Sequence, residues 1–264
     1  MMPRMHWTGN FTIHFAFEAA GYIAAIIIYA VQRRRCGDVV PDETRASVLA
    51  GAAVGAMIGT RLLFVLCDPA NNIHNILGGK TIVGGLLGGL IGVELTKKFL
   101  GVRRSTGNLF VEPLIAAMCI GRIGCFLTGP ADQTAGNPTS LPWGIAIADG
   151  IPRHPVALYE IAFLLALLPL LRRIRKNEIA GTGPFSHDGD TFRIFLASYL
   201  LFRLAVDFLK PDPRPILLGM TAIQWACVAG LLYYLSVLRN DNRDPALPFL
   251  RRGRVDLHHV LPQD

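Results

Sequence analysis

The sequence predicts an all-α integral membrane protein with seven transmembrane helices, its N-terminus outside the cytoplasm and its C-terminus inside. Three features predict this fold class: an apolar composition, seven long apolar runs, and basic residues that flank these runs unequally. Of the 264 residues, 52% are hydrophobic and 17% are charged, and the mean hydropathy is +0.40. Because soluble domains carry about 25% charged residues, this composition favours a lipid environment.

The apolar runs give the expected helices, since a spanning helix needs about 20 mostly apolar residues. We expect them at residues 11–31, 46–67, 81–96, 107–128, 155–171, 190–209 and 216–237. The third and fifth runs are short and depend on their flanks. A Gly/Pro-rich external loop is expected at 129–154. The chain then divides into a seven-helix domain of residues 1–239 and a basic cytoplasmic tail of residues 240–264.

Basic residues set the orientation. With the N-terminus outside, 18 of the 26 lysines and arginines lie on the cytoplasmic side, five lie outside and three lie within apolar runs. The outer five are Arg4, Lys80, Arg153, Lys210 and Arg214. Cytoplasmic loops carry the excess of basic residues in membrane proteins. The same rule explains the net charge of +7, and the chain contains no motif that would make nucleic acid a partner.

Cysteines and glycines have structural interpretations. The five cysteines are Cys36, Cys67, Cys119, Cys125 and Cys227. Their odd number, their scatter and the absence of a CxxC pair predict buried small residues rather than disulfides or a metal site. Glycines repeat every four residues in two of the runs, which predicts close contact between the two helices. These glycines are Gly51, Gly55 and Gly59 in one run and Gly84, Gly88 and Gly92 in the other.

Ionisable residues within apolar runs are the main functional candidates, because a charge at the bilayer centre costs at least about 2.5 kcal/mol. The candidates are Glu18, Arg61, Glu94, Arg122, Glu160, Arg203 and Asp207. Arg122 and Arg203 lie toward the outer leaflet, and a guanidinium binds phosphate oxygens in a planar fork. The alternative is simple neutralisation, of Arg203 by Asp207 and of Arg122 by Glu112 or Glu160.

The segment 121–160 is the most unusual part of the chain. An apolar run ends in a Gly/Pro-rich loop, which re-enters the membrane through RHPVALYE. His154 is able to exchange protons near neutral pH, and Tyr159 and Glu160 follow it into the next helix. The alternative is a surface loop fastened to the bundle by polar contacts.

Three motifs carry a resemblance to a known family: GRIGCF at 121–126, RHPVALYE at 153–160 and FRLAVDFLKPD at 202–212. In this order and spacing the sequence resembles prolipoprotein diacylglyceryl transferases over residues 11–238. The resemblance implies a multi-pass enzyme of the bacterial plasma membrane without a cofactor. It would transfer the diacylglyceryl group of phosphatidylglycerol to the lipobox cysteine in the signal peptide of a prolipoprotein, releasing glycerol 1-phosphate.

The resemblance also assigns residues. Arg122 matches the arginine of the family's GRxGNF signature, in which Gly121 and Gly124 flank it, and Arg203 matches an essential arginine. Asp207 stands where glutamate is usual. Gly84, Gly85 and Tyr159 are further matches. The residues expected to bind substrate are these three, Gly121, Gly124 and Asp207, together with Cys125, which stands at the position of a signature asparagine.

Several positions depart from the family pattern. Val83 replaces the histidine of an HGG motif, Cys125 replaces an asparagine, Thr128 and Pro130 replace a second asparagine and a glutamate, and His14 replaces a tyrosine. The general base therefore stays open between His154 and His14. Two alternatives to the transferase also stay open: a variant lipid-modifying enzyme on the same scaffold, and a non-catalytic lipid-binding protein.

Overall fold

The computed structural model describes residues 11–37, 42–67, 79–102, 105–129, 136–146, 150–183, 185, 187–211 and 215–241. Seven α-helices form in this part of the chain: α1 Phe11–Cys36, α2 Asp42–Cys67, α3 Ile82–Leu100, α4 Val111–Thr128, α5 Val156–Ala180, α6 Asp190–Val206 and α7 Ala222–Asp241. The short 3-10 helix η2 (Gly107–Phe110) precedes α4, and η4 (Asp207–Leu209) follows α6. The prediction of an all-α chain with seven helices is confirmed, with the addition of a small hairpin of β1 (Ile145–Ala146) and β2 (Pro152–Arg153).

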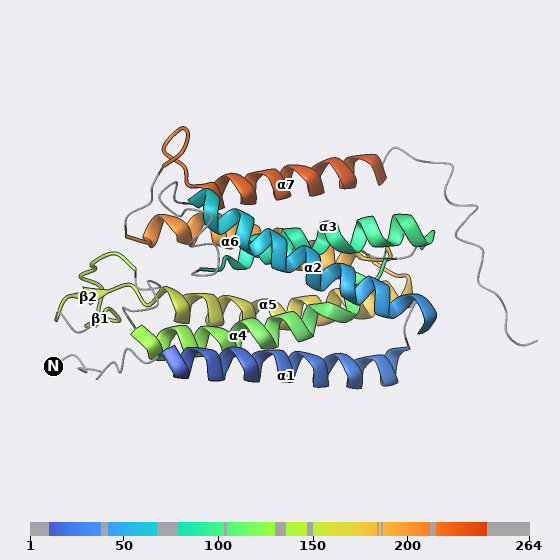
Figure 1. Ribbon diagram of the computed structural model, residues 1–264, viewed down its shortest axis with the longest axis horizontal. Coiled ribbons are helices and arrows are strands. Elements are labelled where there is room, and N and C mark those ends of the chain that lie inside the picture. Colours follow the sequence, from blue (N-terminus) through green and yellow to red (C-terminus); the bar gives the residue numbers. More distant parts are fainter. Residues whose placement is uncertain are drawn as a thin grey trace, which may run out of the picture.

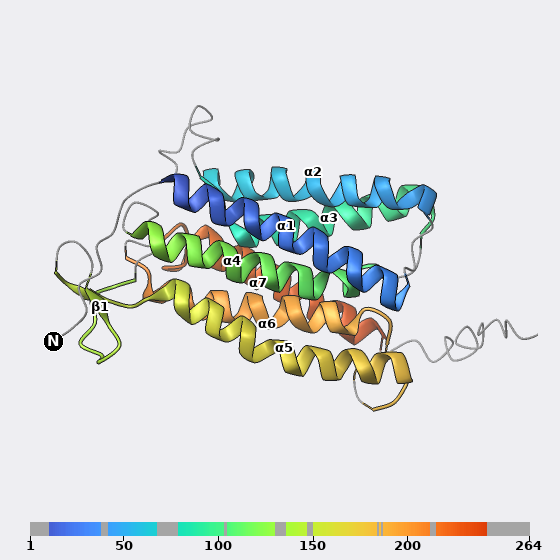
Figure 2. The same cartoon turned by 90° about the horizontal axis from the view of Figure 1, so that it is seen from below.

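The helices lie side by side in one elongated bundle (Figures 1 and 2). The most extensive helix contacts are between α2 and α3 and between α1 and α4. Helix α6 lies between α5 and α7 and contacts both. Helix α6 is central, because Phe195, Leu196, Tyr199 and Leu200 are completely buried. The β-hairpin, the start of α1 and the end of α6 share one end of the bundle, and the end of α7 lies at the other.

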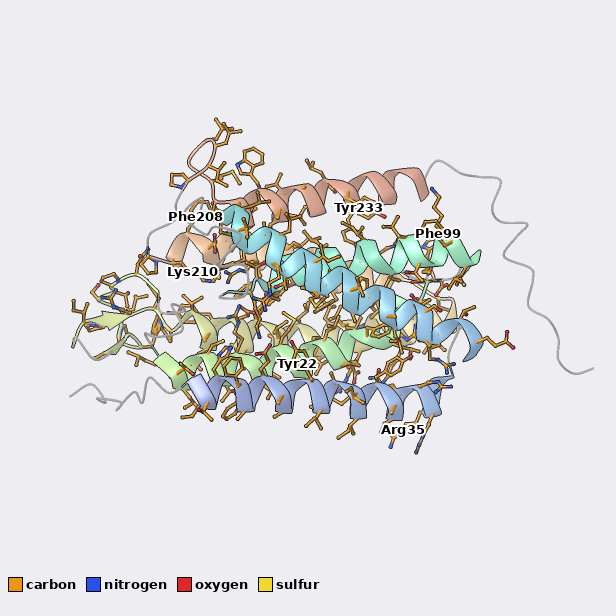
Figure 3. All side chains as sticks on the ribbon, viewed as in Figure 1. Tyr22, Arg35, Phe99, Phe208, Lys210 and Tyr233 are labelled. Carbon is orange, nitrogen blue, oxygen red and sulfur yellow. The ribbon has the colours of Figure 1, made fainter. Side chains whose placement is uncertain are left out.

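The outside of the bundle is apolar. Tyr22, Phe99, Phe208 and Tyr233 project from four different helical segments into the surroundings (Figure 3). Within the described residues, three helices are long and apolar enough to cross a membrane, over Thr12–Arg35, Glu43–Cys67 and Gly107–Thr128. The exposed apolar side chains need a lipid environment, since soluble proteins rarely expose large contiguous apolar patches.

Several helix boundaries differ from the predicted ones, and the end of α5 and the start of α7 differ most. Helix α5 continues to Ala180 instead of ending at residue 171, so the basic segment predicted as a loop is helical until Gly181 ends it with φ 64°. Helix α7 begins at Ala222 rather than residue 216, because Leu217–Met220 form a tight turn. Thr221 and Gln224 then cap α7 reciprocally, with side chain-to-backbone hydrogen bonds of 3.2 and 2.9 Å. This T-x-x-Q capping box is a helix-start signal in the sequence.

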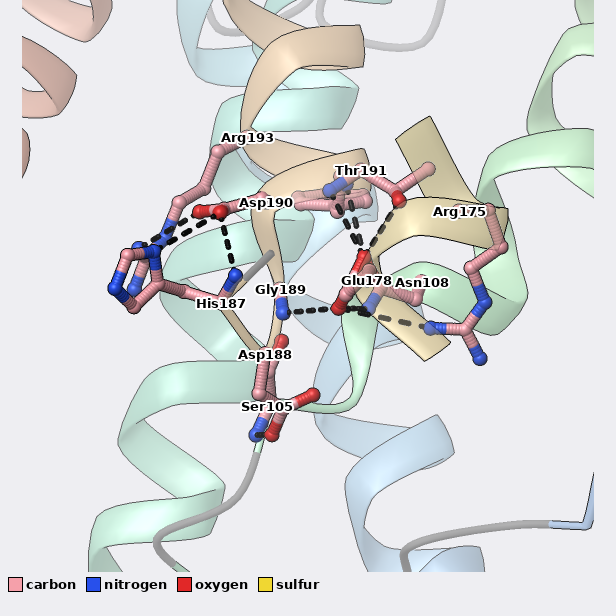
Figure 4. A network of polar contacts seen from close by, with 11 residues as sticks. Ser105, Asn108, Arg175, Glu178, His187, Asp188, Gly189, Asp190, Thr191 and Arg193 are labelled. Atoms are coloured by element: carbon pink, nitrogen blue, oxygen red, sulfur yellow. Dashed lines mark hydrogen bonds and ion pairs between the residues drawn. The ribbon is translucent and has the colours of Figure 1, made fainter. Parts of the chain in front are cut away.

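A polar network closes the end of the bundle opposite the hairpin (Figure 4). The Glu178 carboxylate on α5 accepts hydrogen bonds from Gly189 N and Thr191 Oγ1, at 2.8 and 2.6 Å, and from Asn108 Nδ2. Asp190 pairs with Arg193 and contacts the His187 backbone. The network fastens the α5–α6 connection and η2 together, which is a structural role.

The glycine repeats place α2 and α3 in direct backbone contact. A Cβ atom added at Gly88 would lie 2.3 Å from the carbonyl oxygen of Gly55, and one at Gly84 equally close to that of Gly59. The predicted close packing of these helices is therefore confirmed. Gly89 is different, because a Cβ there would have ordinary contacts at 3.5 Å.

The glycine contact yields a stability prediction. Gly88→Ala should lower the free energy of unfolding by about 1–3 kcal/mol, because the added methyl group forces two backbones apart. Gly89→Ala on the same helix should change it by less than about 1 kcal/mol, since helix propensity favours alanine. Unfolding by denaturing detergent in mixed micelles measures both variants, and equal losses would contradict the close contact.

Candidate functional site

Four buried charged residues meet where α4, α5 and α6 converge. Arg122 Nη2 lies 2.9 Å from Glu160 Oε2, and Arg203 Nη1 lies 3.8 Å from the same oxygen. Arg203 Nη2 also pairs with Asp207 Oδ1 at 3.2 Å. Glu160 is 0% exposed, and the other three are at most 8% exposed. We call Arg122, Glu160, Arg203 and Asp207 the arginine–carboxylate cluster.

Two hydroxyl groups fix the carboxylates of this cluster. Tyr199 OH donates to Glu160 Oε1 at 3.0 Å, and Thr221 Oγ1 donates to Asp207 Oδ2 at 2.7 Å. The sequence analysis did not single out either residue. Tyr199 precedes Arg203 by four residues and so shares its helix face, which is the signal that would have found it. Thr221 lies within the capping box of α7.

Both interpretations of the arginines have a geometric basis. The neutralising pairs exist, and the partner of Arg122 is Glu160, whereas Glu112 pairs with Arg172 at 2.8 Å. The pairs do not use every donor, however. Arg122 Nε and Arg203 Nη1 are buried without a hydrogen-bond partner among the described atoms. Since a buried unsatisfied donor costs about 1–3 kcal/mol, these two N–H groups suit an incoming anionic oxygen.

His154 lies at the hairpin end of the bundle. Its Nδ1 is 3.1 Å from Tyr159 OH, which also accepts a hydrogen bond from Trp143 Nε1 at 2.9 Å. Backbone hydrogen bonds join His154 to Gly136 and Asn137. Among the described contacts of His154 none reaches an arginine of the cluster, but Tyr159 directly precedes Glu160 on α5.

His14, the second candidate base, belongs to another group of polar residues. On α1, His14 Nε2 lies 4.0 Å from Glu18 Oε2, and Glu18 pairs with Lys80 at 2.5 Å and accepts a hydrogen bond from Tyr22 at 3.0 Å. The two candidate bases are thus in different polar clusters.

A comparison of sequences identifies the family. A family model described as prolipoprotein diacylglyceryl transferase matches residues 5–239. This chain belongs to the prolipoprotein diacylglyceryl transferase family. It is therefore a membrane transferase of lipoprotein biosynthesis, and its integral membrane nature agrees with the apolar surface of the bundle.

Three relatives are named phosphatidylglycerol–prolipoprotein diacylglyceryl transferase. The protein of Bordetella bronchiseptica is 31% identical, with 90% of this chain and 93% of the relative covered. The Clostridium tetani protein is 32% identical, covering 86% and 91%. The Solidesulfovibrio magneticus protein is 31% identical, covering 80% and 81%.

The signature glycines of this transferase have two kinds of surroundings. A Cβ at Gly124 would lie 2.6 Å from Phe17 on α1, and one at Gly84 would meet Gly59, so both positions serve helix packing. Gly121 has nothing within 4 Å of such a Cβ, and Gly85 has its nearest neighbour at 3.9 Å. Of the four, Gly121 and Gly85 leave room for a ligand. Their role in substrate binding stays a prediction.

Three of the departures from the family pattern, Val83, Cys125 and Thr128, are buried, whereas His14 is half-buried beside Glu18. Val83 is 1% exposed within the hydrophobic core. Cys125 is buried with its Sγ 3.8 Å from Arg122 Nη1, and Thr128 Oγ1 donates to the carbonyl of Gly124 at 2.9 Å. Pro130 lies outside the described residues. Cys125 therefore contacts the cluster directly. Its burial agrees with a compact packing residue.

Glu160 carries the stability of the cluster. Glu160→Gln should lower the free energy of unfolding by about 3–5 kcal/mol, because two buried arginines lose their shared counter-charge. Glu112→Gln, which removes the exposed pair with Arg172, is the matched control and should cost less than about 1 kcal/mol. Thermal unfolding in detergent compares the two variants, and a Glu160→Gln protein as stable as the control would refute the shared pair.

Proposed function

We propose that this chain transfers the diacylglyceryl group of phosphatidylglycerol to the thiol of the lipobox cysteine of a prolipoprotein, and that the arginine–carboxylate cluster binds the lipid phosphate. Family membership supports the reaction, and the relatives are named for both substrates. The observation that carries the site assignment is the pair of buried guanidinium donors, Arg122 Nε and Arg203 Nη1, that have no hydrogen-bond partner among the described residues.

The reaction is a displacement at carbon. The thiol sulfur attacks the glycerol carbon of the diacylglyceryl group that bears the phosphate oxygen, so that a C–S bond forms and the C–O bond breaks. Glycerol 1-phosphate leaves with the bonding electron pair and gains a second negative charge, and the thiol proton passes to a base. A free thiol has a pKa of about 8.5, so a weak base is enough to remove its proton. Stabilising the negative charge that develops on the leaving phosphate is the harder requirement.

The cluster meets that demand by preorganisation. Arg122 and Arg203 reach the same place from α4 and α6, and Glu160 and Asp207 hold them at 2.9 and 3.2 Å. Fixed charges in a water-poor site stabilise developing charge strongly, because they need no reorganisation during the reaction. We assign phosphate binding to both arginines and their orientation to the two carboxylates.

The base remains a choice between two histidines, and we favour His154. Its hydrogen bond to Tyr159 connects it to the residue before Glu160. The mobile proton of an imidazole suits this task near neutral pH. His14 is held at Glu18 on α1, and its replacement should therefore affect transfer less.

In the membrane we place all seven helices across the bilayer of the bacterial plasma membrane, with the N-terminus outside. The hairpin and the arginine–carboxylate cluster then lie toward the outer leaflet. Phosphatidylglycerol and the signal peptide of the prolipoprotein would reach the cluster from that side. The basic tail of residues 240–264 would be cytoplasmic. Its residues beyond 241 lie outside the described part of the chain. The basic asymmetry and the shared end of hairpin and cluster support this placement.

The phosphate role predicts that lysine cannot replace either arginine. Arg122→Lys and Arg203→Lys should each reduce transfer nearly as much as the alanine variants, by about 100-fold or more, because lysine lacks the planar fork. The assay combines the purified protein with phosphatidylglycerol and a lipobox peptide, and it measures glycerol phosphate release. Arg172→Lys, in an exposed pair, is the control and should retain full activity.

A double replacement separates phosphate binding from simple neutralisation. If Arg203 only neutralises Asp207, Arg203→Leu combined with Asp207→Leu should restore transfer. We expect no rescue, because the leucine pair removes a phosphate ligand together with its counter-charge. A rescued double variant would rule out the phosphate role of Arg203.

The topology is testable with reporter fusions. Fusions after Arg35, Arg104 and Arg254 should report a cytoplasmic position, and so should one after Gly183, which follows the end of α5. A fusion within residues 139–141 of the external loop should report the opposite side. A periplasmic signal from the C-terminal fusion would exclude seven spans with the N-terminus outside.

A further inference from the structure

The arginine–carboxylate cluster by itself is electrically balanced. Its two guanidinium groups, on Arg122 and Arg203, are matched by the carboxylates of Glu160 and Asp207. The N–H groups without a partner are able to donate directional hydrogen bonds to an oxygen. A cluster without net charge, however, has little attraction for an anion at a distance. Selection of an anionic lipid headgroup therefore needs a further positive charge at this end of the bundle.

Lys210 is placed to supply that charge. It directly follows η4, and its backbone N–H donates to the carbonyl of Asp207 at 3.2 Å. Asn137 fixes the preceding residues, through hydrogen bonds of 2.7 Å to the Leu209 carbonyl and 3.3 Å to the Phe208 carbonyl. Figure 3 shows Lys210 at the end of α6 near the hairpin. Its backbone position is thus anchored to both the cluster and the external loop.

The Lys210 ammonium forms no salt bridge within the described part of the chain, although the carboxylates of Asp207 and Glu160 are near enough to act on it. No salt bridge formed by the described residues includes it, whereas Lys80, also expected outside, pairs with Glu18 at 2.5 Å. Together, the four charged groups of the cluster and Lys210 carry one surplus positive charge. That surplus equals the single negative charge of a phosphodiester.

We infer that Lys210 is a specificity-determining residue, whose surplus charge selects an anionic phosphodiester lipid with an uncharged headgroup over a zwitterionic one. This inference rests on the proposed function and extends it to the choice of lipid. A headgroup with its own ammonium has no net charge to offer, and that ammonium would approach Lys210 and the arginines with like charge. Specificity then arises from a repulsive element as well as an attractive one.

The surroundings of Lys210 make the selection dependent on pH. Burial, followed by the nearby charges of Arg203 and Arg122, lowers the pKa of Lys210 to about 7, against the opposite effect of Asp207 and Glu160. From α2, the Cys67 thiol also faces this group. Below this pKa Lys210 is charged and holds the phosphodiester. Above it the free protein loses the charge, so affinity for the anionic lipid should fall as pH rises from about 6 to 8.

The test uses the full-length protein and four forms: wild type, Lys210→Gln, Lys210→Arg and Lys98→Gln. Lys98 is exposed near the C-terminal end of α3, so its replacement controls for the loss of one lysine. Transfer is measured with phosphatidylglycerol in mixed micelles, with phosphatidylethanolamine as competitor. Native mass spectrometry measures the binding of each lipid separately from turnover.

We expect Lys210→Gln to raise the KM for phosphatidylglycerol about tenfold with kcat within about twofold, as expected for one lost, partly screened charge. Its preference for phosphatidylglycerol over phosphatidylethanolamine in binding should fall by a similar factor. Lys210→Arg should keep the wild-type KM near pH 6 but lose the rise of KM between pH 6 and 8, because arginine stays charged. Lys98→Gln should behave as wild type.

Two results would overturn the inference. One is a Lys210→Gln protein with unchanged KM and unchanged lipid preference. The other is a fall in kcat at constant KM in both Lys210 variants, which would make Lys210 a base. Absence of transfer in the wild type would instead refute the proposed function, and lipid preference in binding would still decide the role of Lys210.

Discussion

The buried carboxylate of Glu160 is the interaction on which the rest of the site depends. It is fully buried on α5, and it receives Arg122 from α4, Arg203 from α6 and the hydroxyl of Tyr199. An unpaired carboxylate at this depth would be very costly, and so would either arginine alone. Three helices are therefore held in one register by charges that are tolerable only together.

The two ends of the bundle hold the helices around the cluster in different ways. Glycine contacts bring α2 and α3 together without side chains, and the Glu178 network closes the far end of α5 and α6. The hairpin end is different in kind. There His154 is held by hydrogen bonds to Tyr159 and to the loop residues Gly136 and Asn137, and Lys210 is held by a backbone hydrogen bond to Asp207.

The proposed function divides the tasks among these residues. In that proposal the guanidinium groups of Arg122 and Arg203, positioned by Glu160 and Asp207, bind the phosphate. Lys210 is proposed to add the net positive charge, and His154 is proposed to take the thiol proton. Substitutions such as Val83 and Thr128 lie within packed surroundings, which is why the scaffold accommodates them while Arg122 and Arg203 keep their mutual geometry.

The sequence by itself determined the membrane class, the seven helices, the α2–α3 glycine contact and the presence of two arginines within apolar helices. These follow from hydropathy, charge distribution and residue spacing, which are properties of a linear pattern. Only the tertiary structure decided that Arg122 pairs with Glu160 while Glu112 pairs with Arg172, that Tyr199 and Thr221 hold the carboxylates, and that Lys210 is left with surplus charge. Ion pairing depends on distances between helices far apart in the chain, and no local pattern encodes those distances.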